Sequence, residues 1–295
     1  MTSVQEGPSL TEVGRPIFGA TLPGCATPCA RQTPLTDAEV HEVVELLADA
    51  RQHRATIELP ERLRTRHWDS ITRIVLELDT RRGLPPIGWK IGAASETVRR
   101  AEGLPYPSPG RLYKGNVFKS GSTLPPELFI NYRNNECEFA FIMDKELAPR
   151  STPYTEEEVD QAIGCMVLAM EIGDTVFPDW YGVSGYLGSC LDNGGGAAIV
   201  HGDPIPDWRK LDLPSTRIDL YLNGAWVKSG TGEAAMGHPR TSLTWLVNWL
   251  NSRGITLAAG EIVSTGTCTG HCFAAPGDEI RAVFEGVGEV TVSYA

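Results

Sequence analysis

Apolar residues recur at helical spacing twice in the first third of the chain. Thr36 and Glu39 have the spacing of a capping box, and the apolar positions that follow are Val40, Val43, Val44, Leu47 and Ala50. A second helix is predicted over residues 68–82, with an inward face of Ile71, Ile74, Val75 and Leu78. These patterns predict a small helical unit over residues 36–85. Residues 1–35 contain five Pro and four Gly without periodicity and are predicted to form an N-terminal arm.

The pattern changes in residues 86–295, where short β-like runs are separated by Gly and Pro. The apolar run 139–143 is typical of a buried strand. Apolar and polar residues alternate over 280–284 and 290–294, which predicts two final strands, and Asn223-Gly224 is a strong hairpin signal. The sum is an α+β fold with a largely antiparallel, Gly-rich sheet core.

Two further helices are predicted within this main domain. One begins at the capping box of Thr155 and Glu158 and ends near Glu171, with an apolar face of Val159, Ile163, Met166, Val167 and Met170. The other covers residues 242–253 and is closed by a glycine. Residues 101–127 are rich in Gly, Pro and Ser and are predicted to form a loop that serves as a lid or pocket wall.

Composition narrows the class of protein. The 295 residues are 41% hydrophobic and 21% charged, as in a soluble globular protein, and the net charge of −11 argues against nucleic-acid binding. No apolar run reaches the roughly 20 residues that span a bilayer, and the first residues lack a signal-peptide core. We therefore expect a cytoplasmic protein that binds neither nucleic acid nor membrane.

The seven cysteines are an odd number and fit free thiols in a reducing cytoplasm better than a disulfide framework. Cys25 with Cys29, and Cys268 with His271 and Cys272, could suggest zinc. The usual zinc pairing has two residues between cysteines, whereas both pairs here have three. This spacing argues against a structural zinc site.

Glu136 and Glu138 lie on either side of Cys137, directly before the apolar run 139–143. Side chains at i and i+2 of a strand point to the same face, so the two carboxylates would lie together. Two buried like charges repel unless they are paired, and a hard divalent ion is the simplest partner. The alternative is an exposed edge strand whose carboxylates meet water.

Other residues are candidates for the same chemistry. Lys90 lies between glycines in an apolar run, where its ammonium either faces a carboxylate or reaches out to water. Glu171 or Asp174 could supply a third ligand, and spacing does not choose between them. The loop 265–270 has hydroxyls and amides suited to an anion. His238 and His271 are either acid–base groups or ordinary loop histidines. Phosphate-loop, dinucleotide-binding and serine-hydrolase motifs are absent.

Several short motifs occur together in a known order, and with them the chain resembles the fumarylacetoacetate hydrolase superfamily. Within it, the chain looks most like the 2-keto-4-pentenoate hydratase and 4-oxalocrotonate decarboxylase branch. The motifs are Gly88-Trp89-Lys90-Ile91-Gly92, Glu136-x-Glu138-Phe139-Ala140-Phe141, Glu171-Ile172-x-Asp174, Asp192-Asn193, Leu222-Asn223-Gly224, Gly237-His238-Pro239, Ala259-Gly260, Thr265-Gly266-Thr267 and Pro276-Gly277-Asp278. The resemblance covers roughly residues 36–295.

The resemblance implies a mixed β-roll or distorted barrel with helices packed outside, in a protein that is usually a homo-oligomer. It implies Mg²⁺ or Mn²⁺ held by Glu136, Glu138 and Glu171, which leave about three of six octahedral positions for water and a 2-oxo acid. Lys90 matches the family's catalytic pocket lysine. Thr265, Gly266 and Thr267 match the loop that contacts the substrate, so we expect them, with Lys90, to bind it.

The implied activity is that of a metal-dependent lyase that acts on 2-oxo acids through an enolate. The leading expectation is hydration of a 2-hydroxydienoate or 2-oxo-enoate to a 4-hydroxy-2-oxo acid. The alternatives are decarboxylation of a 2-oxo dioate, C–C hydrolysis of an acylpyruvate with His271 as the first base to test, and a binding protein without turnover.

The sequence departs from the hydratase pattern in the stretch 110–116. Hydratases of this branch carry an acidic residue there, and this chain has none. The family's Arg before the two glutamates is displaced by one residue, to Arg133, and Asn193 is followed by Gly. These departures bear on the activation of water and not on the metal or the enolate.

Overall fold

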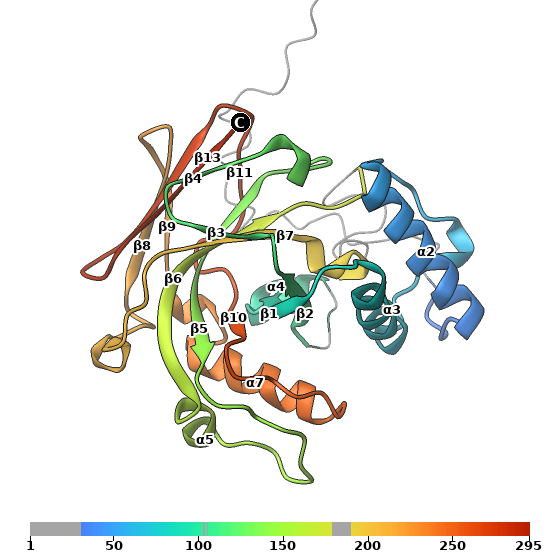
Figure 1. Ribbon diagram of the computed structural model, residues 1–295, viewed down its shortest axis with the longest axis horizontal. Coiled ribbons are helices and arrows are strands. Elements are labelled where there is room, and N and C mark those ends of the chain that lie inside the picture. The colour runs from blue at the N-terminus through green and yellow to red at the C-terminus, as the bar shows by residue number, and fades with distance from the viewer. Residues whose placement is uncertain (1–30, 103, 105, 179–189) are drawn as a thin grey trace, which may run out of the picture.

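The N-terminal helices lie where the apolar pattern predicts them. In the computed structural model, which describes residues 31–102, 104, 106–178 and 190–295, helix α2 spans Asp37–His53 and helix α3 spans Trp68–Arg81. A 3₁₀ turn, Glu61–Leu63, lies between them. The predicted capping box is confirmed, since Thr36 and Glu39 exchange hydrogen bonds. The two helices pack side by side at the right of Figure 1. Most of the predicted arm, with Cys25 and Cys29, lies outside the described residues.

Two β-sheets, with helices beside them, follow the N-terminal helices (Figure 1). The larger runs β2-β1-β10-β5-β6-β7-β3, with β11 paired to β5. The strands are β1 Pro86–Gly92, β2 Ser108–Tyr113, β3 Val117–Lys119, β5 Asn134–Met143, β6 Ile163–Gly173, β7 Gly196–His201, β10 Ile262–Ser264 and β11 Cys272–Phe273. Strand β2 also lies close to β7, so this sheet curls into the distorted barrel that the resemblance implies.

The second sheet has the order β4-β13-β12-β8-β9. Its strands are β4 Ser122–Leu124, β8 Arg217–Leu222, β9 Ala225–Thr231, β12 Glu279–Phe284 and β13 Gly288–Tyr294. The predicted hairpin at Asn223-Gly224 joins β8 to β9, and both turn residues have positive φ. The pairs β1–β10, β3–β7 and β4–β13 are parallel, and the other pairs are antiparallel. The expectation of a mixed, mostly antiparallel α+β fold is confirmed.

The two faces of β5 have different surroundings because side chains alternate along a strand. One face carries Phe139 and Phe141, which pack toward the second sheet, with the ring of Phe139 centred 5.2 Å from that of Phe284. Complete burial of each such side chain contributes roughly 2–3 kcal/mol. The other face carries Glu136, Glu138 and Ala140 and points into the curl of the larger sheet. The apolar packing of β5 and its two carboxylates therefore lie on opposite faces of the strand.

The predicted helix over residues 155–171 is wrong beyond its first turn. Helix α5 spans only Glu156–Asp160, and strand β6 follows from Ile163. Consecutive residues from Met166 to Ile172 are all buried, as in a strand covered on both faces. A continuous apolar run fits a buried helix or a buried strand equally well. As a result, Glu171 lies within a sheet and not at a helix end.

The predicted loop over residues 101–127 is also partly wrong, because it contains strands β2, β3 and β4 as well as the end of helix α4, Glu96–Glu102. Its Gly110 lies on β2, where a Cβ atom would come within 2.6 Å of the Asn193 carbonyl oxygen. This glycine reflects close packing and not a turn.

The last helix, α7, spans Pro239–Asn251, so it begins three residues before the predicted start. His238 precedes it, and its Nδ1 accepts a 3.0 Å hydrogen bond from the Arg240 backbone N–H. That bond gives His238 a structural role as the N-cap.

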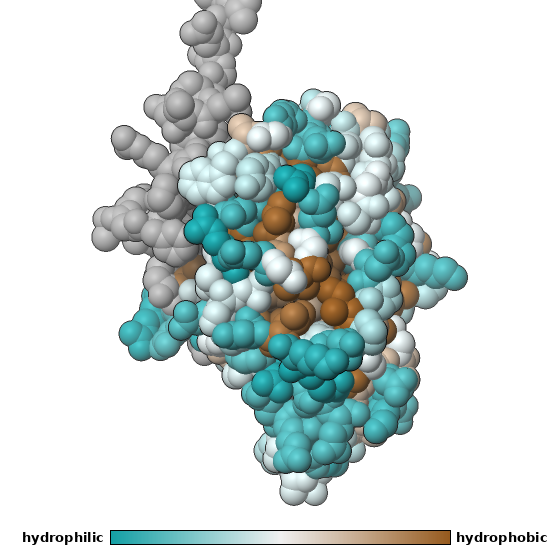
Figure 2. Space-filling model, turned by 90° about the vertical axis from the view of Figure 1, so that its left-hand side faces the viewer, coloured by the Kyte–Doolittle hydropathy of each residue, from teal (hydrophilic) through white to brown (hydrophobic). Residues whose placement is uncertain are grey.

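Figure 2 shows the face of the molecule that lies at the left of Figure 1. Apolar residues gather near the centre of this face, and polar residues surround them. Among the described residues, the large apolar side chains that are exposed are Leu84 and Trp226. None of the described helices has the length and apolar character needed to cross a membrane.

Candidate active site

Strand pairing brings the three predicted carboxylate ligands together. Glu136 on β5 is directly opposite Glu171 on β6, and Glu138 lies two residues further along the same face. Glu138 and Glu171 are only 1% and 3% exposed, and the Glu136 side chain is 14% exposed. These side chains therefore form a buried group of like charges, called here the carboxylate cluster: Glu136, Glu138 and Glu171.

Lys90 is a cation in direct contact with this cluster. It lies on β1, which reaches β5 through β10, and its Nζ is 3.1 Å from Glu171 Oε1. Lys90 is 3% exposed, so the alternative of a lysine that extends into water is wrong. Burial lowers the pKa of Lys90, but the charges of Glu171 and Glu136 outweigh burial and raise it above its ordinary value. The side chain is held as an ammonium inside the protein.

Glu138 has one oxygen that is satisfied and one that is not. Ser264 Oγ and the Gly266 N–H donate to Oε2 at 2.5 and 2.8 Å. Oε1 is buried and, among the described residues, has no hydrogen-bond partner. Burial, with the charges of Glu171 and Glu136, raises the pKa of Glu138 well above its ordinary value. An unsatisfied, charge-repelled carboxylate is what a hard divalent cation would relieve.

Glu136 is oriented by two polar neighbours. Its Oε1 accepts a 2.7 Å hydrogen bond from Asn134 Nδ2 and is 3.1 Å from His271 Nδ1. Burial by itself raises the pKa of Glu136, but His271, Lys90 and Asn134 together lower it below its ordinary value. Asn134 was missed in the sequence, although its position two residues before Glu136 places it on the same face of the strand.

The fit of a divalent ion rests on the donor set. All three cluster members present oxygen, which Mg²⁺ and Mn²⁺ prefer, and Glu138 Oε1 needs a partner. In the described part of the chain, no group of three or more acidic, His or Cys side chains is arranged to hold a metal ion. Lys90 and His271 instead lie against two of the carboxylates. The chemistry of the donor set fits the ion, for which Lys90 would compete at Glu171.

The alternative third ligand, Asp174, is occupied elsewhere. Its carboxylate accepts hydrogen bonds of 2.7–2.9 Å from the backbone N–H groups of Ile130, Asn131 and Tyr132. A carboxylate with three such donors is already satisfied. The geometry therefore favours Glu171.

The predicted substrate loop contributes a backbone group to the site. Gly266 donates its N–H to Glu138, and a φ of +110° there suits glycine. The hydroxyl of Thr265 donates to the Phe139 carbonyl at 2.7 Å, and that of Thr267 accepts from the Gly270 N–H at 2.9 Å. Both hydroxyls hold the loop in shape, and their contact with substrate stays a prediction.

Aromatic rings line the side of the site beyond Glu136. The His271 ring stacks on Phe273, with centroids 6.2 Å apart, and Tyr132 lies 5.8 Å from Phe273. All three residues are half-buried. These three residues are called here the aromatic wall, which His271 joins to Glu136.

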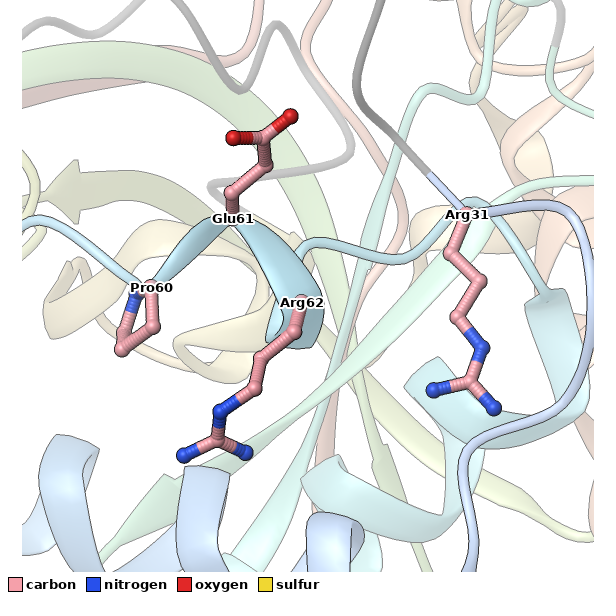
Figure 3. A pocket seen from close by; sticks show the side chains of 4 residues that line it. All are labelled: Arg31, Pro60, Glu61 and Arg62. Carbon is pink, nitrogen blue, oxygen red and sulfur yellow. The ribbon is translucent and has the colours of Figure 1, made fainter.

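A separate pocket lies near the N-terminal helices, lined by Arg31, Pro60, Glu61 and Arg62 (Figure 3). Arg31 and Arg62 already pair with Glu39 and Glu42. No residue of the carboxylate cluster lines this pocket, and it has no part in the chemistry below.

Cys268 and Cys272 are free, buried thiols whose pKa values are raised by burial. A raised pKa disfavours the thiolate that binds zinc.

Comparison with known proteins identifies the family. The family model for the fumarylacetoacetate (FAA) hydrolase C-terminal region matches residues 117–293. The 2-hydroxyhexa-2,4-dienoate hydratase of Comamonas testosteroni is 30% identical over 222 residues, which cover 75% of this chain and 82% of that protein.

Solved structures share the fold. The 4-oxalocrotonate decarboxylase of Pseudomonas putida G7, complexed with magnesium and adipate, has a TM-score of 0.76 at 22% identity and covers 90% of this chain and 100% of that one. A fumarylpyruvate hydrolase of Pseudomonas aeruginosa, in complex with Mn²⁺ and pyruvate, has a TM-score of 0.53 at 17% identity and covers 72% of this chain and 90% of that one. The chain belongs to the fumarylacetoacetate hydrolase family.

Proposed function

We propose that this protein is a Mg²⁺- or Mn²⁺-dependent lyase that hydrates a 2-hydroxydienoate, as its 2-oxo-enoate form, to a 4-hydroxy-2-oxo acid. The observation that carries the proposal is Glu138 Oε1, a buried oxygen that no described residue hydrogen-bonds, beside two other carboxylates. The dienoate hydratase of similar sequence supports the substrate class.

In this proposal the carboxylate cluster holds the metal ion. When bound, the ion supplies Lewis-acid polarisation of the 2-oxo and carboxylate oxygens of the substrate. Ser264 and Gly266 hold Glu138 at Oε2 and leave Oε1 directed at the site. Asn134 likewise holds Glu136 at Oε1. Glu138 and Glu136 are thus each anchored through one oxygen, which orients them before substrate binds.

Lys90 is the catalytic residue of the proposal. Its ammonium lies between Glu171 Oε1 and the Gly194 carbonyl oxygen, 3.1 and 2.5 Å away. A buried ammonium stabilises negative charge on a substrate oxygen more strongly than one in water does. Nζ would donate a proton to the terminal carbon of the dienol and take up the proton of the enol O–H, which converts the dienol to the 2-oxo form and restores the ammonium.

The substrate carboxylate is proposed to meet Thr265, Gly266 and Thr267, and its tail the aromatic wall of Tyr132, His271 and Phe273. An apolar wall excludes bulk water from the far side of the site, which limits the water that can compete with substrate. An unsubstituted or alkyl tail suits this wall better than a charged one.

Decarboxylation of a 2-oxo dioate is the second candidate. The acid that hydratases carry after the lysine motif is absent from residues 110–116. In the structure this stretch is β2 and the turn after it, and Gly110 packs against the Lys90 side chain. Decarboxylation needs the same stabilised enolate and no positioned water, so the missing acid favours it.

The test is a panel of 2-oxo-enoates, 2-oxo dioates and acylpyruvates, incubated with Mg²⁺ or Mn²⁺ and read by mass spectrometry. Gain of water, loss of CO₂ and chain cleavage identify the hydratase, the decarboxylase and the C–C hydrolase. Glu138→Ala is the control and should form no product. Failure to convert any member of the panel with either metal would contradict a lyase function.

A further inference from the structure

A second group of buried charges lies where the N-terminal helices meet the larger sheet. Arg51, on α2, donates from Nε to Asp192 Oδ1 at 3.0 Å and also from Nη2 to Oδ2. The second arginine, Arg82, directly after α3, is 3.5 Å from Asp192. Arg51 also donates to the Asp174 carbonyl oxygen at 2.9 Å. The arginine cluster is Arg51, Arg82, Asp174 and Asp192.

Asp192 begins a tight turn, the 3₁₀ segment Asn193–Gly195. Gly195 donates its N–H to the Asp192 carbonyl oxygen at 3.0 Å, and its own carbonyl oxygen accepts from the Asp174 N–H at 2.7 Å. The Asn193 side chain bonds both the N–H and the carbonyl oxygen of Arg111 on β2. The turn is therefore fixed at both ends, by Asp174 and Asp192 on one side and by β2 on the other.

Gly194, at the centre of this turn, contacts the catalytic ammonium. Its carbonyl oxygen accepts the hydrogen bond from Lys90 Nζ at 2.5 Å. A Cβ atom at Gly194 would come within 2.8 Å of Lys90 Nζ, and one at Gly110 within 2.8 Å of Lys90 Cε. The lysine therefore lies in a slot with backbone on two sides, and a small shift of the turn would move Nζ relative to Glu171.

We propose that Arg51 is a positioning residue for Lys90, acting through Asp192 and the turn that ends at Gly195. The inference rests on the proposed role of Lys90. It assigns the N-terminal helical unit a part in catalysis although α2 supplies no group to the site. Arg51 suits the task because its planar guanidinium bonds both Asp192 oxygens, which a lysine would not do.

The experiment is a double-mutant cycle between Arg51 and Lys90, with Arg51→Gln and Arg51→Lys each made in the wild type and in Lys90→Met. Arg62→Gln is the matched control, because Arg62 makes an exposed pair with Glu42. Circular dichroism and thermal unfolding check the fold, and Arg51→Lys keeps the buried charge if Arg51→Gln does not fold. The readouts are kcat and KM on the active substrate, and the affinity for Mg²⁺ alone by calorimetry.

The proposal predicts that Arg51→Gln lowers kcat about 30-fold with KM within about threefold, since misplacement of a catalytic group by about 1 Å costs up to 100-fold. Arg51→Lys keeps the charge without the two-point contact to Asp192, so it should recover only part of this loss. The affinity for Mg²⁺ should shift about threefold, because Lys90 competes with the ion for Glu171. In Lys90→Met both effects should shrink to less than about twofold.

Equal effects of Arg51→Gln with and without Lys90 would overturn the proposal and leave Arg51 a purely structural role. So would an unchanged kcat and Mg²⁺ affinity. If the wild type converts no 2-oxo acid, the proposed function fails, and the Mg²⁺ cycle still decides whether Arg51 acts through Lys90. If the wild type binds no Mg²⁺, both the site and the inference fall.

Discussion

The carboxylate cluster and the arginine cluster are both buried and charged, yet they are built on opposite principles. In the arginine cluster two guanidinium groups face two carboxylates. Burial raises the pKa of Asp192, but Arg51 and Arg82 outweigh burial and lower it below its ordinary value of 3.8. Both oxygens of Asp192 accept hydrogen bonds, from Arg51, Thr175 and the Val176 N–H.

In the carboxylate cluster three acids face one lysine and one histidine. Burial and the neighbouring carboxylates leave the pKa values of Glu138 and Glu171 raised. Glu138 Oε1 has no partner among the described residues. Balanced charges leave each buried group with a partner, whereas an unbalanced buried set costs stability and is typical of a binding site.

Lys90 bridges the two regions, since it bonds Gly194 on one side and Glu171 on the other. Lys90→Met should lower kcat by about 1,000-fold, or about 4 kcal/mol, within the range for a lost acid–base group. Metal binding should persist, because Lys90 supplies no oxygen ligand. Steady-state kinetics measures kcat, and calorimetry measures the affinity for Mg²⁺. A kcat within threefold of the wild type would show that Lys90 is not a catalytic residue.

Asp192→Asn removes the charge that two buried arginines share. The free energy of unfolding should fall by about 3 kcal/mol, because a broken buried pair leaves an uncompensated charge. Urea unfolding measures this change. The exposed pair of Glu42 and Arg62 is the control, and Glu42→Gln should cost under about 0.5 kcal/mol. Similar losses of unfolding free energy in the two variants would mean that the buried ion pairs of the arginine cluster stabilise the fold no more than an exposed pair does.

Glu138→Gln makes the same chemical change in the carboxylate cluster and should have the opposite effect on the metal-free fold. The amide removes a repelled charge, and its NH₂ can donate to Glu171 or Glu136, so stability should rise by about 1 kcal/mol. Affinity for Mg²⁺ should fall about 100-fold, or about 2.7 kcal/mol. Calorimetry and metal-free urea unfolding test the pair of effects. Lower stability with unchanged affinity for Mg²⁺ would mean that Glu138 stabilises the fold and does not bind the ion.

The pH dependence of unfolding gives the smallest effect. Because the folded-state pKa of Asp192 is lowered, its ionised form stabilises the fold. This contribution is complete above about pH 5 and is lost as the pH falls through the folded-state pKa. The wild type should therefore lose up to about 1.4 kcal/mol per pH unit more than Asp192→Asn on acidification. Urea unfolding between about pH 6 and pH 3 tests this, and parallel curves would contradict the lowered pKa.

Local patterns predicted the elements that depend on near neighbours. Helices α2 and α3 follow from apolar residues at helical spacing and from the Thr36 capping box. The hairpin at Asn223-Gly224 follows from residues that tolerate positive φ. Glu136 and Glu138 share a face because the strand period is two, so two of the three members of the carboxylate cluster were visible within three residues of sequence.

Only the tertiary structure decided the rest of the site. The apolar run before Glu171 fits either a helix or a strand, and the pairing of β6 with β5 selects the strand and places Glu171 opposite Glu136. The same pairing leaves Asp174 outside the cluster. Arg51 and Asp192 are far apart in the chain, and no local pattern links them. Sequence periodicity reports which face a side chain occupies, whereas sheet register and helix docking determine which distant side chain it meets.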